Sequence, residues 1–131
     1  MQNLVHKREH NREYMKQYRK GNPTKLKKWK TTNPEKIRNE RNSWARRERA
    51  RLRGKILDLL GNKCAICGFE NPLVLQIDHV NGGGNQEANR FSSNLQYYAF
   101  ILRQIQKGSK DYQLLCANHN VLKEMERRKN L

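Results

Sequence analysis

Residues Leu73 to Asn85 read Leu-Val-Leu-Gln-Ile-Asp-His-Val-Asn-Gly-Gly-Gly-Asn, and this stretch decides the fold. Apolar and polar residues alternate towards Asp78, a pattern that predicts a half-buried strand. Three glycines in a row at positions 82–84 cannot continue a strand. We therefore expect a strand that ends at His79 and opens into a flexible loop.

Two helices and a second strand are expected after this loop. Residues Asn94 to about Lys107 predict a helix, because five apolar residues share one of its faces: Leu95, Tyr98, Ile101, Leu102 and Ile105. Residues Tyr112 to Cys116 predict the second strand. A last helix is expected to begin at Asn118 or Asn120.

A short helix is expected before the first strand. In Lys55 to Gly61, three apolar residues share one helical face, namely Ile56, Leu59 and Leu60, and Gly61 is a natural C-terminal cap. Strand, loop, strand and helix in this order predict a small α+β domain.

The three cysteines occur in two short pairs of metal-ligand spacing. These pairs are Cys64-x2-Cys67 and Cys116-x2-His119, and 48 residues separate them. A single Cys-x2-Cys pair would also suit a redox site, and Cys116 alone could be a core thiol. Two pairs that use every cysteine instead favour a closed, structural Zn²⁺ site with three thiolates and one imidazole. Such a site would stabilise a core that is otherwise small.

The net charge of the chain is strongly positive and uneven. There are 28 Lys and Arg against 12 Asp and Glu, a net +16, and mean hydropathy is −1.11. Residues 1–53 contain 18 Lys and Arg and 5 Glu, whereas residues 54–131 contain 10 and 7. We therefore expect a basic, mainly helical extension over residues 1–53 and a folded domain over residues 54–131. Nucleic acid is the first expected partner.

No apolar run is long enough for a membrane span or a signal peptide, so the expected compartment is the cell interior.

The extension contains a short repeat. Tyr18 to Leu26 and Trp29 to Ile37 share an Asn-Pro pair, which predicts helices that begin near Pro23 and Pro34. A solvated basic tail is the simple alternative, but the aromatic residues favour contact with a phosphate backbone. The candidate contacts are Trp29, Lys36, Arg38, Arg41, Trp44, Arg46, Arg47 and Arg49.

Asp78, His79 and Asn120 are candidates for chemistry. Asp and Asn oxygens suit a hard cation such as Mg²⁺. A neutral His79 beside it could take a proton from an attacking water. Each of these residues taken alone also has an ordinary structural role, as a strand end, a turn residue or a helix cap.

Together, the segments Cys64 to Gly68, Ile77 to Asn85 and Tyr112 to Lys123 resemble the zinc-containing HNH endonucleases of phages and mobile introns. The resemblance implies a ββα-metal fold and hydrolysis of phosphodiester bonds in double-stranded DNA with one Mg²⁺ or Mn²⁺. It also implies that Asp78 and Asn120 hold this ion, that His79 is the general base through Nε2, and that Lys123 neutralises the phosphate. The implied setting is the cytoplasm of a bacterial or phage-infected cell.

Two features depart from this family pattern. The fourth zinc ligand is usually Cys, whereas here it is His119. The middle Asn is either Asn94, in a segment of the family type but sixteen residues too early, or Asn85 in the Gly-rich loop. No small-molecule substrate is expected, and the oligomeric state stays open. The alternative function is a non-catalytic zinc module that binds nucleic acid.

Overall fold

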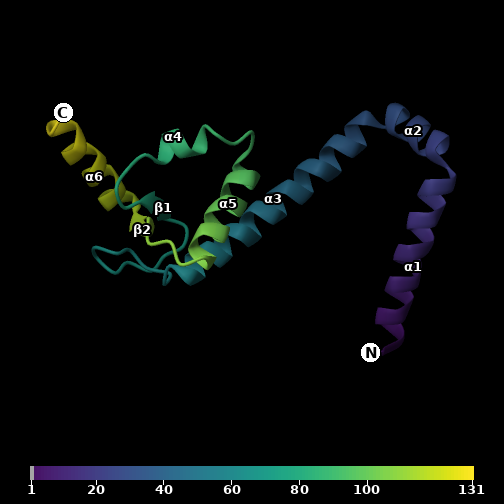
Figure 1. Ribbon diagram of the computed structural model, residues 1–131, viewed down its shortest axis with the longest axis horizontal. Helices are drawn as coiled ribbons and strands as arrows, with labels where there is room; N and C mark the ends of the chain where they lie inside the picture. The colour runs from purple at the N-terminus through teal and green to yellow at the C-terminus, as the bar shows by residue number, and fades with distance from the viewer. Residues whose placement is uncertain (1) are drawn as a thin grey trace. The chain divides into compact units, whose positions relative to one another are not determined.

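A computed structural model defines the backbone of residues 2–131 and the side chains of residues 4–131. It contains two compact units, Met1–Ser43 and Trp44–Leu131. The boundary expected from composition, between Arg53 and Gly54, lies ten residues later and stays a prediction. Helix α3 (Pro34–Leu59) includes both positions (Figure 1).

The first unit contains helices α1 (Gln2–Gly21) and α2 (Pro23–Thr32) and the beginning of α3. The expected helix starts at Pro23 and Pro34 are confirmed. The Asn22 side chain makes no N-terminal cap for α2. Instead Asn22 Nδ2 donates to Tyr18 O at 2.9 Å, and Asn33 Nδ2 likewise donates to Trp29 O at 3.0 Å. The sequence repeat is therefore a structural repeat, in which each Asn caps the helix before it.

The expected short helix at residues 55–61 is the end of α3 rather than a separate element. Its buried residues are Leu52, Ile56 and Leu57, whereas Leu59 is 54 % exposed. The expected face was therefore wrong at Leu59. Gly61, just after the helix, has φ +92°, a conformation that favours glycine.

The sheet consists of two antiparallel strands, β1 (Leu75–His79) and β2 (Tyr112–Cys116). The bounds of β2 are as expected, and β1 ends at His79 as expected. However, β1 begins at Leu75, and Leu73 is 89 % exposed. In the register, Leu75 pairs with Cys116 and His79 pairs with Tyr112.

The segment between the strands contains two helices, α4 (Gly84–Ala88) and α5 (Asn94–Gln106). Helix α5 confirms the prediction, and the Ser93 side chain caps its N-terminus by accepting from Gln96 N at 3.3 Å. Helix α4 was not expected. The segment leaves and rejoins the hairpin at adjacent points, because Val80 N donates to Asp111 O at 2.9 Å.

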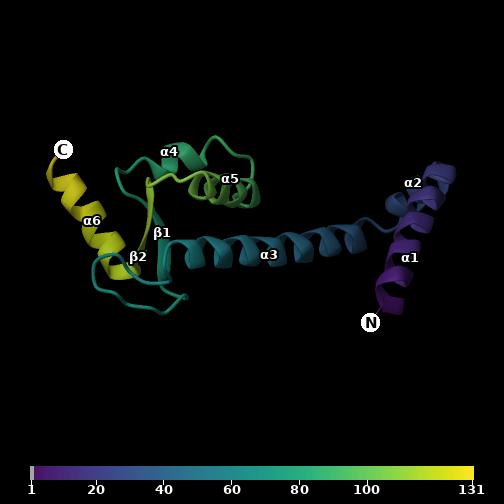
Figure 2. The same ribbon diagram turned by 60° about the horizontal axis from the view of Figure 1, so that its bottom comes forward.

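Helix α6 (Ala117–Lys129) follows β2 directly and contacts both strands. It begins slightly earlier than expected. The second unit is thus α+β, as predicted. Strands β1 and β2 pair directly and α6 follows them, while α4 and α5 come between the two strands in the sequence (Figure 2). None of the helices in the described part of the chain combines the length and apolar character that crossing a membrane requires.

The core of the second unit has two clusters of buried residues. One contains Leu57, Cys64, Leu75, Leu114, Leu115 and Cys116 and lies around the sheet. The other contains Leu52, Ile56, Ile101, Leu102 and Tyr112 and joins α3 to α5. Leu60 and Ile77 pack against both clusters. Two of the predicted zinc ligands therefore belong to the core itself.

Candidate metal centre and the end of strand β1

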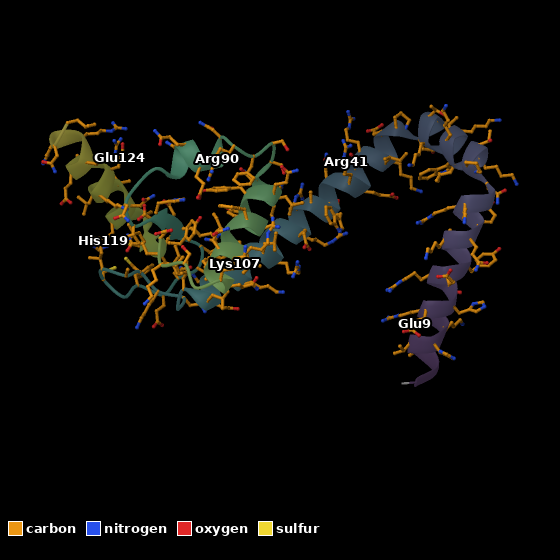
Figure 3. All side chains as sticks on the ribbon, viewed as in Figure 1. Glu9, Arg41, Arg90, Lys107, His119 and Glu124 are labelled. Atoms are coloured by element: carbon orange, nitrogen blue, oxygen red, sulfur yellow. The ribbon has the colours of Figure 1, made fainter. Side chains whose placement is uncertain are left out.

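Cys64, Cys67, Cys116 and His119 lie close enough together to bind a metal ion. Their four ligand atoms are all within 4.8 Å of one another. The first pair lies in the loop after α3, and the second pair lies at the end of β2 and in the first turn of α6, where His119 is labelled in Figure 3. The predicted ligand set is thus brought together from segments far apart in the sequence.

The distances between these atoms suit a tetrahedral zinc ion. Zn–S bonds of about 2.3 Å and Zn–N bonds of about 2.0–2.1 Å place neighbouring ligand atoms about 3.6–3.8 Å apart. Here Cys64 Sγ lies 3.6 Å from His119 Nδ1, and Cys67 Sγ lies 3.9 Å from Cys116 Sγ. Cys116 Sγ and His119 Nδ1 are 3.2 Å apart. Four protein ligands would leave no open position on such an ion, as in structural zinc sites.

Backbone hydrogen bonds shape the loop that carries the first pair. Cys64 N donates to Phe69 O, and Gly68 N donates back to Cys64 O, both at 2.9 Å. Burial of the Cys64 sulfur opposes ionisation, but backbone N–H groups at Cys67, Cys116 and Ile66 outweigh burial and lower the pKa of Cys64 to about 6. The thiolate is the form that binds metal, so these N–H groups favour the ligating state of Cys64.

Asp78 lies on the face of β1 that α6 covers. Its Oδ2 accepts from Lys123 Nζ at 2.6 Å and from Gln113 Nε2 at 2.8 Å. Lys123 Nζ also donates to His79 O at 2.5 Å and Val80 O at 3.2 Å. Lys123 thus ties α6 to the end of β1, and its ammonium already neutralises the Asp78 carboxylate.

Asn120 lies one turn before Lys123 on the same face of α6. Its Nδ2 donates to Gln76 Oε1, so in this structure Asn120 contacts Gln76 rather than Asp78. Because Gln76 and Asp78 share one face of β1, the helix residues Asn120 and Lys123 face the strand residues Gln76 and Asp78 in order. Asp78 and Asn120 were expected to hold one ion together, but in this structure Asn120 contacts Gln76, two residues before Asp78 on the same face of β1.

His79 projects from the other face of β1, since neighbouring strand residues point to opposite faces. Its side chain is 13 % exposed, and Nε2 lies 2.5 Å from Glu87 Oε2. The Tyr97 hydroxyl lies 3.3 Å from the same nitrogen, and the Tyr112 ring meets the imidazole edge-on at 4.9 Å between centroids. The Nε2 atom expected to hold a water therefore faces a carboxylate.

Sequence reasoning did not identify Glu87, which lies in the unexpected helix α4. Burial raises its pKa, but hydrogen bonds from His79 and Tyr112 outweigh burial, so the pKa of Glu87 is lower than usual. Burial and the nearby Glu87 carboxylate raise the pKa of Tyr97 and Tyr112. At neutral pH the cluster therefore contains an ionised carboxylate and two protonated tyrosines.

Neither candidate for the middle Asn takes part in this cluster. Asn94 is exposed at the first position of α5, and Asn85 is exposed in α4. Among the described residues, the groups that hydrogen-bond the His79 ring come from Glu87 and Tyr97. The choice between Asn94 and Asn85 stays open.

The proposed nucleic-acid contacts differ in their surroundings. In the first unit, Lys36 Nζ lies 5.9 Å from the centre of the Trp29 ring, and Arg41, labelled in Figure 3, is exposed. Arg38, also in the first unit, is exposed as well. The candidate contacts in the second unit are exposed at Trp44, Arg46 and Arg47 and half-buried at Arg49. Arg53, further along α3, has a different role, because its Nη2 donates to Pro72 O at 2.8 Å and Leu75 O at 2.6 Å.

No protein-family model matches the chain, and no curated protein or solved structure is significantly similar to it. What the site can do must therefore follow from its own geometry.

Proposed function

We propose that the second unit is an HNH-type endonuclease that hydrolyses phosphodiester bonds in double-stranded DNA, and that the basic helices before it bind the duplex. The observation that carries this proposal is the contact of Lys123 Nζ with Asp78 Oδ2 at 2.6 Å. It brings the Asn120-x2-Lys123 pair of α6 against the strand end that carries Asp78 and His79. The zinc-ligand cluster supports it, because this cluster joins the start of α6 to the loop before β1.

Asp78 and Asn120 supply the oxygen ligands that a hard divalent ion prefers. Lys123 engages Oδ2 of Asp78, and Gln76 engages Nδ2 of Asn120, so Oδ1 of each residue is the atom left for a metal. By donor type the residues therefore fit Mg²⁺ or Mn²⁺. Such an ion would supply positive charge to the phosphate and to its leaving oxygen.

His79 is the proposed general base. It takes one proton from a water molecule as the water oxygen forms a bond to phosphorus. The bond between phosphorus and the 3′ oxygen breaks, and solvent protonates the alkoxide that leaves. The ammonium of Lys123, which pairs with Asp78 in this structure, would have to leave that ion pair to neutralise charge on the phosphate. The basic helices position the duplex without reading much of its sequence.

The test uses zinc-loaded full-length protein and supercoiled plasmid, with and without Mg²⁺ or Mn²⁺. We expect metal-dependent nicking that His79→Ala reduces by about 10²–10⁴-fold, the usual contribution of a general base. Asp78→Asn should also abolish nicking. Asp58→Asn is the matched control, because Asp58 lies on α3 and accepts only from Asn62 Nδ2 at 2.8 Å among the described side chains.

A non-catalytic zinc module that binds nucleic acid is the second candidate. It is favoured by the low exposure of His79 and by the ion pair between Asp78 and Lys123, since both groups are already satisfied within the protein. Folded, zinc-loaded protein that shifts duplex DNA in a gel but leaves several unrelated plasmids intact would support this candidate and contradict the nuclease.

A further inference from the structure

Glu87 is the centre of a four-residue cluster that the proposed chemistry does not yet use. Its Oε2 lies 2.5 Å from His79 Nε2 and accepts from the Tyr97 hydroxyl at 3.2 Å. The Tyr112 hydroxyl donates to Oε1 at 3.0 Å and lies 3.1 Å from Oε2. Arg90, labelled in Figure 3, approaches Oε1 at 3.5 Å. The carboxylate is thus surrounded by groups from α5, β2, the end of β1 and the turn after α4.

The chemistry of this contact determines where the imidazole proton lies. An ionised carboxylate can only accept hydrogen bonds, and the hydroxyls of Tyr97 and Tyr112 already donate to the Glu87 carboxylate at 3.2 Å and 3.0 Å. His79 Nε2 must therefore carry a hydrogen. In the neutral ring the lone pair is then on Nδ1.

Gly84 leaves space on the Nδ1 side of the ring. A Cβ atom at residue 84 would lie 2.8 Å from His79 Nδ1 and 3.2 Å from its Cε1. Any side chain at this position would press on the edge of the imidazole that carries the lone pair. The three-glycine loop therefore turns close to His79 without covering Nδ1 with a side chain.

We infer that Glu87 is a positioning residue for His79. It holds the ring through Nε2–H, so Nδ1 rather than Nε2 is the nitrogen that accepts the proton of the attacking water. Tyr97 and Tyr112 hold the Glu87 carboxylate in place. The role of Nδ1 as the base rests on the proposed nuclease function. The assignment of the His79 hydrogen to Nε2 does not.

The first test is the tautomer of His79 in the zinc-loaded full-length protein. Long-range ¹H–¹⁵N correlation spectra of the neutral imidazole distinguish a protonated nitrogen from a bare one. We expect protonated Nε2 and bare Nδ1 in the wild-type protein. Protonated Nδ1 would overturn the inference whether or not the protein cuts DNA.

The second test compares Glu87→Ala with Glu87→Gln. The alanine variant removes the acceptor, so we expect a mixture of His79 tautomers and a roughly 10–100-fold lower kcat for plasmid nicking with KM unchanged, the usual range for a residue that orients another. The glutamine variant keeps an amide oxygen near Nε2 and should recover much of the kcat and of the single His79 tautomer. Glu126→Ala on the exposed side of α6 is the control and should change neither quantity.

The outcomes separate the two proposals. Wild-type protein that shows the Nε2–H tautomer but never nicks DNA would refute the nuclease and leave the tautomer assignment correct. Wild-type protein that nicks DNA, while Glu87→Ala keeps both its kcat and a single His79 tautomer, would refute the role of Glu87. A variant that merely loses stability would lower the melting temperature without changing the tautomer of the folded fraction.

Discussion

Gly84 and Gly54 show how the surroundings of a glycine decide whether its replacement by alanine stabilises or destabilises the fold. Gly84 begins α4 against the ring of His79, whereas Gly54 lies within α3, and a Cβ at residue 54 would meet nothing within 4 Å. Glycine in the middle of a helix costs roughly 0.5–1 kcal/mol relative to alanine. The two positions therefore form a natural pair of test and control.

We expect Gly84→Ala to lower the free energy of unfolding by about 1–3 kcal/mol, the usual cost of forcing an extra methyl group into a packed site. Gly54→Ala should raise it by about 0.5–1 kcal/mol. Urea denaturation of both zinc-loaded variants measures the difference. Equal stability of the two variants would contradict the contact between residue 84 and His79.

The four residues of the possible metal cluster were predictable residue by residue, and Glu87 was not. Each ligand pair has a local spacing that a single loop or helix turn can satisfy, so Cys64, Cys67, Cys116 and His119 could be chosen without knowing the fold. Glu87 has no such signal. It reaches His79 only because α4 folds back over the end of β1, a contact that depends on tertiary structure.

Helix α3 extends further than its sequence indicated, and Arg53 shows what this helix does for the fold. The guanidinium of Arg53 hydrogen-bonds two carbonyl groups in and just before β1, namely those of Pro72 and Leu75. Arg47, a few residues earlier on the same helix, is exposed. One arginine thus fastens helix to strand, and the other faces solvent.

We expect Arg53→Ala to destabilise the second unit by about 1.5–3 kcal/mol, because it removes two charged hydrogen bonds to backbone carbonyls, of which the one to Leu75 is partly buried. Arg47→Ala should change stability by less than about 0.5 kcal/mol. Thermal unfolding of the two variants measures this difference. If Arg53→Ala weakened only DNA binding and left the melting temperature unchanged, its structural role would be refuted.

The elements with a clear hydrophobic period were predicted well. Helix α5 and strand β2 follow their apolar patterns, and the prolines at 23 and 34 start helices as expected. The break expected at Gly54 does not occur, because one glycine costs a helix only about 1 kcal/mol and the core contacts of Leu52 and Ile56 outweigh that cost. Helix α4 is five residues long and too short to show a period.

At the scale of the whole molecule, the candidate zinc site joins the loop after α3 to the end of β2 and the start of α6. Cys64 and Cys116 are buried in the same cluster as residues of α3 and of both strands. We expect one zinc ion per chain by native mass spectrometry, and we expect chelation to unfold β1 and β2 cooperatively, because metal binding and folding are coupled in small domains. Hydrogen exchange should show this as loss of protection in both strands. A chain without bound metal would contradict the prediction.

Helices α1 and α2 and the exposed beginning of α3 can be removed without touching the core, because the buried residues of α3 start at Leu52. Residues 1–43 contain 13 Lys and Arg and 4 Glu, a net +9, whereas a cut after residue 53 would also remove the buried Leu52. Deleting residues 1–43 should weaken duplex binding and flatten the plot of log K against log salt, by roughly 0.9 for each phosphate that these helices neutralise. Fluorescence anisotropy at several salt concentrations measures the slope. An unchanged slope, with zinc content intact, would show that these helices do not bind phosphate.

The hydrogen bond from Val80 N to Asp111 O has a consequence for how such a chain can evolve. Because the segment from 81 to 110 starts and finishes at one place on the hairpin, residues can be inserted in its exposed turns without shifting the pairing of β1 with β2, while Ile101 and Leu102 of α5 keep their place in the core. Doubling the length of a flexible loop costs only about 0.6 kcal/mol of closure entropy. Homologous chains are therefore expected to keep the spacing within each ligand pair, Cys64 with Cys67 and Cys116 with His119, and to vary in the number of residues between the two pairs. Natural variation in the partner of His79 would then come from this exchangeable segment.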